Sequence, residues 1–590
     1  MKYFKNKFYS FSLLLLLTSC QQEEFLNLEP KDELTEATTF TSYGNILTYS
    51  WSFYDVFPGF VPSIPTSERN GDLFLRAAAN AESDWIWQRI TVPSSSTDWN
   101  APYSNIRRVN IMLDNLDDSG MTQENMDHWR SVGYFFRTYN YFELVKKYGA
   151  VPWVENKVGD DDDIIYAPRT PRNEVTRTML EQLQWAEEHI KPEGDGPNTI
   201  DIHAVRALIS RFGLFEGTWR KYHNLGEEEL YLRASADASE KLISSFPDLH
   251  PNFDEVFNSE SLAGVAGIIL FKPYESNQYT HGQTSRARNS SGRYDLTKKA
   301  ADMYLMKDGQ TRWTSPLFEG DKSPYTEFRN RDRRFYYTVT PPYSVSTPNS
   351  TSNEWSFTEE PIHREYIDFM NEISDPVHKT LPQRNWQGTV LRQVPHYVDD
   401  RRGQAFIITY TGYYYWKNYN MILNGINWAD IADAPIFRMG EILVNYAEAK
   451  FELGEFDQTI ANQTINKLRE RGHVASLDVG NIPDDPTRDT NVDPVLWEIR
   501  RERAIELMGE GYRPDDLRRW KKMDYVTERK LGRWIKRSEV NNVPILNGEN
   551  EGYIDYYGQP PEEFPEYYYL YPIPSDQLVL NPQLEQNPGW

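Results

Sequence analysis

Apolar residues recur at helical spacing in two long blocks of the sequence, and this periodicity limits the chain to a mainly α fold. The first block spans about residues 100–245 and the second about 435–525. In the first, the segment SNIRRVNIMLDNL places apolar side chains three or four positions apart, on one face of a helix. The next segment, WRSVGYFFRTYNYFELVKKYG, continues the pattern, and we expect its helix to stop at Gly149.

Three further helices are expected before residue 245. The first begins near PRNEVTRTMLEQLQWAEEHI, with Asn173 as its candidate N-cap. The segments IHAVRALISRFGLFEGTW and YLRASADASEKLISS give the other two. Small residues recur where helices would pack closely, namely Ala204, Ala207, Gly213, Ala234, Ala236 and Ala238.

The second block begins with a helix–turn–helix pattern over FRMGEILVNYAEAKFELGEFDQTIANQTINKLRERG. The alternation of large and small residues along it resembles a tetratricopeptide helix pair (Tyr446, Ala447, Leu453, Gly454 and Ala461). Several such pairs, stacked on one another, would form a superhelical spine. The segment LWEIRRERAIELMGEGYRPDDLRRW is expected to be a last amphipathic helix, whose run of charges lies on a solvated face.

Loop signals dominate the middle of the chain, about residues 250–430. The segment TPPYSVSTPNSTSNEW is a cluster of Pro, Ser, Thr and Asn. Short β-like pieces such as GIILF, AFIITY and YYTVT are scattered through it. We therefore expect one domain over residues 41–590, in which an irregular, loop-rich half with short strands accompanies the helical repeats.

The first twenty residues have the pattern of a lipoprotein signal. Three lysines precede a short apolar core, Phe11–Leu17, which is too short to span a membrane. Cleavage after residue 19 would leave Cys20, the only cysteine, at the new N-terminus. The LTSC sequence resembles a bacterial lipobox, so we expect residues 1–19 to be a signal peptide, Cys20 to be lipidated and residues 20–40 to form a leader.

Composition and motifs argue against several classes of function. A net charge of −24 repels phosphate backbones, which excludes nucleic acid as a partner. A single lipidated cysteine excludes thiolate catalysis and cysteine metal sites, and no hydrolase or nucleotide-binding motif is present. No cofactor is expected. The acidic run 159–163 has the oxygen ligands that calcium prefers, but it lacks EF-hand spacing, so we favour a solvated loop over a structural calcium site.

Aromatic residues make up 14% of the chain, and flat rings beside Asn, Asp, Arg or Gln are suited to stacking against sugars and binding their hydroxyls. Three non-helical stretches combine these residue types. In the first, two tryptophans two positions apart would share one face of an extended segment. The candidate glycan-binding residues of the three stretches are, in order, Asn70, Asp72, Trp85 and Trp87; Tyr274 and Tyr279; Trp355, Arg384 and Trp386.

Several motifs resemble the SusD/RagB-like nutrient-uptake lipoproteins of Bacteroidetes. These are FLNLEPKDELTEATTF (25–40), YGAVPWV (148–154), DLTKKAADMYLMKDGQ (295–310), NRDRRFYYTV (330–339), TGYYYWK (411–417), APIFRMGEILVNYAEA (434–449), IRRERAIELMGEGYRPDDLRRW (499–520) and YLYPIPSDQLVLNPQLEQNPGW (569–590). The last is the most specific. Arg333 stands where the family has proline.

The resemblance implies a SusD-like fold with tetratricopeptide-like units. It also implies a lipid-anchored protein on the extracellular face of the outer membrane, which captures oligosaccharide and delivers it to a SusC-like TonB-dependent transporter without catalysis. Most of these motifs look like features of the fold or of partner docking. Two alternatives stay open at this point: a tetratricopeptide-type lipoprotein that binds peptide cargo, and, more distantly, a glycoside hydrolase.

Overall fold

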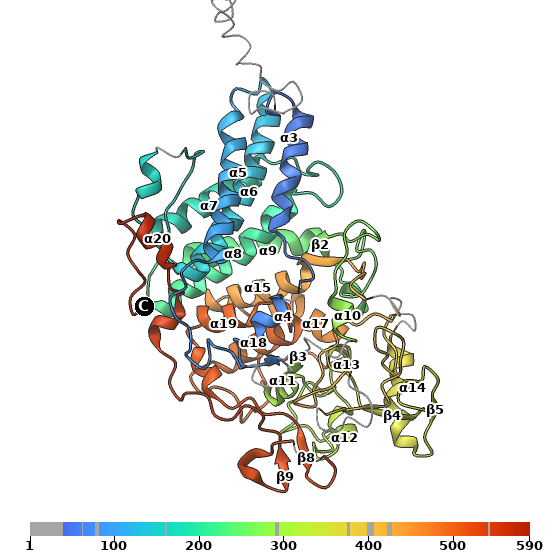
Figure 1. The fold of residues 1–590 in the computed structure, drawn as a ribbon. Coiled ribbons are helices and arrows are strands. Elements are labelled where there is room, and N and C mark those ends of the chain that lie inside the picture. Colours follow the sequence, from blue (N-terminus) through green and yellow to red (C-terminus); the bar gives the residue numbers. More distant parts are fainter. Residues whose placement is uncertain are drawn as a thin grey trace, which may run out of the picture.

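The computed structural model describes residues 39–61, 63–76, 82–159, 162–288, 294–374, 378–397, 406–421, 427–540 and 543–590. It is mainly helical, with several two- or three-stranded sheets, which confirms the expected fold class (Figure 1). The longer helices are α3 (Tyr43–Ser50), α5 (Thr97–Asn115), α6 (Gln123–Tyr148), α7 (Arg172–His189), α8 (Ile202–His223), α9 (Glu228–Ser245), α14 (Glu365–Ile373), α15 (Met439–Glu452) and α18 (Pro494–Glu506).

The shorter helices connect or extend these elements. They are α4 (Ser63–Glu68), α10 (Gln283–Arg286), α11 (Lys298–Met303), α12 (Pro324–Phe328), α13 (Arg333–Thr338), α16 (Gln458–Gln463), α17 (Ile465–Arg471), α19 (Arg513–Arg519) and α20 (Ser575–Leu580). The 3-10 turns are η2 (Trp51–Val56), η3 (Asp163–Tyr166), η4 (Asp254–Val256), η5 (Pro361–Arg364), η6 (Met523–Thr527), η7 (Leu546–Gly548) and η8 (Glu566–Tyr569).

Helices α5 to α9 pack in chain order, each against the next or the next but one, and α15 closes onto α8 and α9. The expected close packing at small residues is clearest at Gly213, where a Cβ would lie 2.7 Å from the Tyr231 carbonyl oxygen of α9. The expected helix stop at Gly149 is also confirmed, since this residue has a φ of 75° and follows the last residue of α6. In Figure 1, the second helical block lies beneath the first.

Three local expectations were wrong. Helix α7 begins at Arg172, with Pro171 in the cap position, because proline's fixed φ suits a helix start; Asn173 is therefore inside the helix. The YYTVT piece belongs largely to helix α13. The segment 496–520 forms two helices, α18 and α19, because Gly509 and Gly511 between them have φ values of 80° and 93°.

The charged residues of α18 are buried, and this corrects the expectation of a solvated helix face. Glu506 Oε1 accepts from Arg438 Nη1 at 2.5 Å and from Arg471 Nη2 at 2.6 Å, and Glu506 Oε2 accepts from Arg334 at 3.2 Å. The sequence shows that these residues of the helix are charged. It does not show that arginines from other segments neutralise them. The buried network takes in Arg334, Arg438, Glu448, Arg469, Arg471, Glu498, Arg501, Glu502, Arg503, Glu506, Glu510, Asp516 and Arg519.

The C-terminal motif ties the end of the chain to the first helical block. Asn587 Nδ2 donates to the carbonyl oxygens of Tyr148 and Tyr571, at 3.1 and 2.8 Å. Arg169 Nη1 donates to Asn587 Oδ1 at 2.6 Å. The segments 148–154 and 569–590, which both resemble motifs of the SusD/RagB-like family, are thus connected by hydrogen bonds.

The sheets are small. The strands are β1 (Phe74–Arg76), β2 (Ile268–Lys272), β3 (Tyr294–Leu296), β4 (Tyr343–Ser346), β5 (Ser356–Phe357), β6 (Gln393–Val394), β7 (Ala434–Arg438), β8 (Trp534–Lys536) and β9 (Glu551–Tyr553). The pairs are β1–β3, β2–β7 and β8–β9, and β4 pairs with both β5 and β6. The GIILF piece is thus a strand, β2, as expected, whereas AFIITY contributes only an isolated bridge at Thr409 among the described residues.

The signal peptide, Cys20 and most of the leader lie outside the described residues. Among the helices of the described ranges, none is both long and apolar enough to cross a membrane.

Candidate functional site

The antiparallel pairing of β2 with β7 joins two loop segments that are about 150 residues apart in sequence. Lys272, the last residue of β2, lies opposite Ala434, the first residue of β7. The chain that follows β2 must therefore run beside the chain that precedes β7. A further bridge between His281 and Asp430 keeps the two segments together.

Tyr274 and Tyr279 of the first segment stack on each other. Their ring centroids are 5.1 Å apart and the planes differ by only 3°. Tyr274 is buried, and its hydroxyl oxygen accepts the Phe60 N–H at 3.0 Å; burial raises its pKa to about 12, so it stays neutral. Tyr279 is 50% exposed, and the Lys272 ammonium lies 5.2 Å from the centre of its ring.

Trp428 of the second segment provides another half-exposed ring, with 49% of its surface accessible. The indole packs directly on Gly282: a Cβ at that position would lie only 1.8 Å from Trp428 Cε3, so the position requires glycine. The Arg286 guanidinium lies 5.2 Å from the centre of the indole. Trp428 was not among the predicted residues, although its sequence surroundings, NGINWAD, have the same mixture of an aromatic ring with amides and a carboxylate.

Buried polar groups fix these two segments. Asp430 accepts the backbone N–H and the hydroxyl of Ser285, at 2.7 and 2.8 Å. Asp433 accepts the N–H of Tyr274 at 2.9 Å. Burial lowers the pKa of His281, and the neutral ring donates from Nε2 to the Ala432 carbonyl while Nδ1 accepts the Gln283 N–H. We refer to Phe60, Tyr274, Tyr279 and Trp428 as the aromatic rim.

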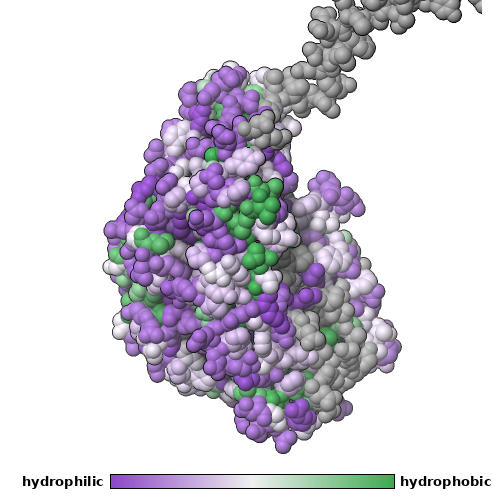
Figure 2. Space-filling view, turned by 60° about the vertical axis from the view of Figure 1, so that its left-hand side comes forward, coloured by the Kyte–Doolittle hydropathy of each residue, from purple (hydrophilic) through white to green (hydrophobic). Residues whose placement is uncertain are grey.

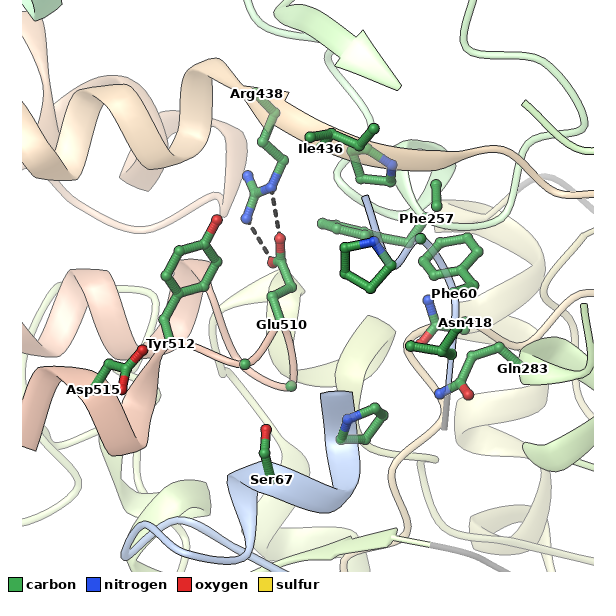
Figure 3. Close-up of a pocket in the computed structure, with 18 of the residues that line it drawn as sticks. Phe60, Ser67, Phe257, Gln283, Asn418, Ile436, Arg438, Glu510, Tyr512 and Asp515 are labelled. Atoms are coloured by element: carbon green, nitrogen blue, oxygen red, sulfur yellow. Dashed lines mark hydrogen bonds and ion pairs between the residues drawn. The ribbon is translucent and has the colours of Figure 1, made fainter. Parts of the chain in front are cut away.

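A cavity of about 260 Å³ adjoins the aromatic rim, and we call it the cleft (Figure 3). It lies between α6 and α8 of the first helical block and the α18–α19 connection of the second. Phe60 belongs to the rim and also lines the cleft, and Gln283 of the cleft wall follows Gly282, on which Trp428 packs. The apolar part of its lining includes Phe257 and Ile436.

The charged groups of the cleft wall are paired with one another. Arg438 Nη2 and Nε donate to the two carboxylate oxygens of Glu510, at 2.6 and 2.9 Å (Figure 3). Lys417 Nζ also contacts Glu510, at 2.7 Å, and burial lowers the pKa of this lysine to about 8. Because these charges neutralise each other, the cleft wall offers polar atoms without a strong net charge.

The neutral polar groups of the cleft include one with no partner. Gln283 is 4% exposed, and its Oε1 has no hydrogen-bond partner among the described residues. Asn418 also lines the cleft and accepts from the Tyr415 hydroxyl at 3.2 Å, and the hydroxyl-bearing Ser67 lies on the opposite side (Figure 3). A buried acceptor without a partner is costly, so Gln283 is suited to bind a hydroxyl donor from a ligand.

The first predicted group of residues, in the segment 70–87, lies mostly in packed surroundings. Trp85 is 3% exposed, and its ring stacks 4.4 Å from that of Tyr571. Residues 84–88 form turns instead of the extended segment that we expected, so Trp87, which is half-buried, does not share a face with Trp85. Asp72 is buried in an ion pair with Arg513 at 2.8 Å, and Asn70 accepts the Ser83 hydroxyl at 2.6 Å.

The third predicted group comes together in a separate place. Arg384 Nη1 donates to the Asn353 carbonyl at 3.1 Å, which joins the loop of Trp386 to the loop of Trp355. Trp355 is half-buried and its ring contacts Phe357 edge-on at 4.9 Å. Of the three predicted groups, only Tyr274 and Tyr279 are in the aromatic rim beside the cleft.

No cluster of three or more potential metal-ligating side chains occurs in the part of the chain that the structure describes. Of the acidic run 159–163, residues 160 and 161 lie outside that part. Within it, the Asp162 carboxylate accepts the Gly159 N–H at 2.6 Å.

Comparison with known proteins identifies the family. Residues 267–590 match the model of the SusD family, and residues 25–214 match a model described as starch-binding proteins associating with the outer membrane. The chain belongs to the SusD family. It is therefore a binding protein associated with the outer membrane and not an enzyme.

Two proteins of Formosa agariphila are similar to this SusD family member. SusD-like protein P2 is 25% identical over 168 residues, which are 28% of this chain and 31% of that protein. SusD-like protein P38 is 22% identical over 601 aligned positions, which cover 100% of this chain and 99% of that one.

Solved structures share the fold over nearly the whole length. A SusD-like protein of Bacteroides fragilis has a TM-score of 0.67 at 19% identity, and covers 95% of this chain and 100% of its own. A SusD-like carbohydrate-binding protein of the same species has a TM-score of 0.66 at 18% identity, with 93% and 100% covered. At this level of identity the likeness establishes the fold alone.

Proposed function

We propose that this protein captures an oligosaccharide at the aromatic rim and the cleft, and delivers it to a SusC-like TonB-dependent transporter. The observation that carries the proposal is the unpartnered, buried Gln283 Oε1 in the wall of a cleft that shares Phe60 with the aromatic rim, in which Tyr279 and Trp428 are half exposed. Flat rings bind the apolar faces of a sugar, and a buried acceptor binds one of its hydroxyls.

Sugar contact is assigned to Tyr279, Trp428 and Gln283, with Tyr274 as the support on which Tyr279 stacks. Asp72 and Trp85 belong to the packing of the fold. Membership of a carbohydrate-binding family supports the ligand class, and the paired charges of the cleft wall suit the hydroxyls of a neutral sugar unit.

The same proposal includes the anchor. Cleavage before Cys20 and lipidation of its thiol would hold the protein at the outer surface of the outer membrane. A single acyl chain binds membranes only weakly, so two or three chains, or the transporter itself, are needed for a stable attachment.

The test is calorimetry of the purified protein against plant, host and microbial polysaccharides. We expect saturable binding of one glycan class and a loss of at least tenfold in affinity in Tyr279→Ala. Trp51→Ala, which removes an equally exposed ring outside the cleft, is the matched control. Equal binding by wild type and Tyr279→Ala would contradict the assignment of the site, and binding of peptides in place of any glycan would support the peptide-cargo alternative.

A further inference from the structure

The connection between α18 and α19, residues 507–512, forms part of the cleft wall. Gly509, Glu510, Gly511 and Tyr512 all line the cleft. Both glycines have left-handed backbone angles, with φ values of 80° and 93°. Glycine leaves the backbone freer than any other residue does. The position of this wall therefore depends on groups outside the connection.

Lys417 holds the connection from one side. Its Nζ donates to the Met508 carbonyl oxygen at 3.1 Å and to Glu510 Oε1 at 2.7 Å. Arg438 Nη2 donates to the same carboxylate oxygen at 2.6 Å. These contacts fix the first half of the connection and the Glu510 side chain.

Glu68, the last residue of α4, holds the second half of the connection. The Gly511 N–H donates to Glu68 Oε1 at 2.6 Å. Ser67, its neighbour in α4, points toward the connection across the cleft (Figure 3). Beyond the connection, Arg513 donates to both carboxylate oxygens of Asp72, at 2.8 and 2.9 Å. Glu68 is thus a direct link between α4 and the cleft wall.

The burial of Glu68 is unusual for a carboxyl group. Charged side chains mostly stay in water, and the face of the molecule in Figure 2 is mainly hydrophilic. Only 2% of the surface of Glu68 is accessible. Burial raises the pKa of Glu68 to about 8, and the Gly511 N–H and the Arg513 charge offset only part of this effect. At neutral pH the group is therefore mostly protonated, and its carbonyl oxygen accepts the Gly511 N–H without a buried charge.

The charged groups around Glu68 do not favour its ionisation. Arg513 is shared with Asp72, and the carboxylate of Asp516 opposes a second negative charge. Burial lowers the pKa of Lys530 to about 7, so this lysine provides little positive charge above neutral pH. The titratable groups that face Glu68 from the surrounding elements are Asp72, Lys299, Tyr415, Arg513, Asp516 and Lys530.

We propose that Glu68 is a positioning residue of the glycan site, which in its protonated form holds Gly511 and the cleft wall in the binding conformation, so that alkaline solution weakens binding. The proposal rests on the proposed function for its ligand. An ionised carboxylate draws water toward the connection, whereas a bound glycan excludes water from the cleft. Glycan binding therefore raises the pKa of Glu68 further, and by linkage the affinity falls as the pH rises through about 8.

Hydrogen exchange of the free protein at pH 7 tests the positioning without any ligand. Glu68→Ala removes the acceptor, so residues 507–512 should exchange at least tenfold faster than in wild type. Glu68→Gln keeps the Oε1 acceptor and should exchange as wild type does. Asp457→Ala is the matched control, because it removes a carboxylate that accepts the Ile460 N–H at the start of α16, away from the cleft. Equal exchange of 507–512 in wild type and Glu68→Ala would overturn the proposal.

Calorimetry with the polysaccharide that binds wild type in the panel tests the effect on affinity. Between pH 7 and pH 9, wild-type affinity should fall about fivefold more than that of Glu68→Gln. Lys417 titrates in both proteins, so the difference between the two profiles reports on Glu68. Parallel profiles would overturn the proposal and leave the proposed function intact, since both proteins bind. Absence of wild-type binding to every polysaccharide would instead contradict the proposed function and, with it, a role of Glu68 in binding.

Discussion

The buried charge network around α18 and the aromatic rim beside the cleft use opposite means to hold their residues in place. In the network, each carboxylate is surrounded by guanidinium groups, and Glu506 alone contacts Arg334, Arg438 and Arg471. In the rim, rings are held by backbone hydrogen bonds and by a single glycine, while Tyr279 and Trp428 stay half exposed. The two regions meet at Arg438 and Glu510, which belong to the network and also line the cleft.

We therefore expect the buried network to determine the stability of the fold and the aromatic rim to determine ligand binding. Removing one partner of a buried charge pair leaves another charge buried without compensation, so changes in the network should affect the whole fold. Changes at exposed rings remove little burial, so they should affect ligand binding alone.

Glu506→Gln should produce the largest effect. Three buried arginines would lose their shared negative charge, and we expect a loss of about 3–5 kcal/mol in the free energy of unfolding. Denaturant unfolding measures it. The control is Asp368→Asn, which breaks a surface pair with Arg364 and should change stability little. A small effect of Glu506→Gln would mean that the network does not hold the fold together.

Acid should weaken the same network. Burial alone would raise the pKa of Glu448, but the charge of Arg519 and its hydrogen bonds outweigh this and lower it to about 2. A carboxyl with a lowered pKa contributes stability above its unfolded value near 4.5, and this contribution is lost as the pH falls from about 4.5 to 2. Unfolding free energies across this range should fall steeply in wild type and less steeply in Glu448→Gln. Equal slopes in the two proteins would contradict the assignment.

Trp428→Ala should reduce glycan affinity by at least tenfold, about 1.4 kcal/mol, without a change in thermal stability. The indole is half exposed, so little buried surface is lost. Affinity electrophoresis in gels that contain the bound glycan, alongside a thermal melt, separates the two effects. If Trp428→Ala lowered the melting temperature as much as Glu506→Gln does, the rim would contribute to stability as the network does, and the proposed separation would be wrong.

Gly282→Ala should have a smaller effect of the same kind. The new methyl group would collide with the Trp428 ring and displace it, although all four rings of the rim would still be present. We expect a loss of affinity of about threefold, read from the same gels. Gly44→Ala, in an open position of helix α3, is the matched control and should bind glycan as wild type does. Unchanged retardation of Gly282→Ala would show that the position of Trp428 is not critical.

Periodicity predicted the helical blocks well, because amphipathic faces and stops such as Gly149 are local signals. It could not predict that the charges of α18 are buried, since their partners Arg334 and Arg438 come from distant segments. The aromatic rim was only partly predicted for the same reason. Tyr274 and Tyr279 were predicted because they lie in one stretch of the sequence. Trp428 comes near them only through the β2–β7 pairing. Trp85, which was also predicted, packs against Tyr571 instead.

The most direct test of the separation is hydrogen exchange with and without the glycan that calorimetry selects. The account predicts ligand-dependent protection of residues 274–286 and 427–433, and no change over 497–519, where the buried network is already protected in the free protein. Protection that appears over 497–519 while 274–286 and 427–433 stay unchanged would contradict the central claim.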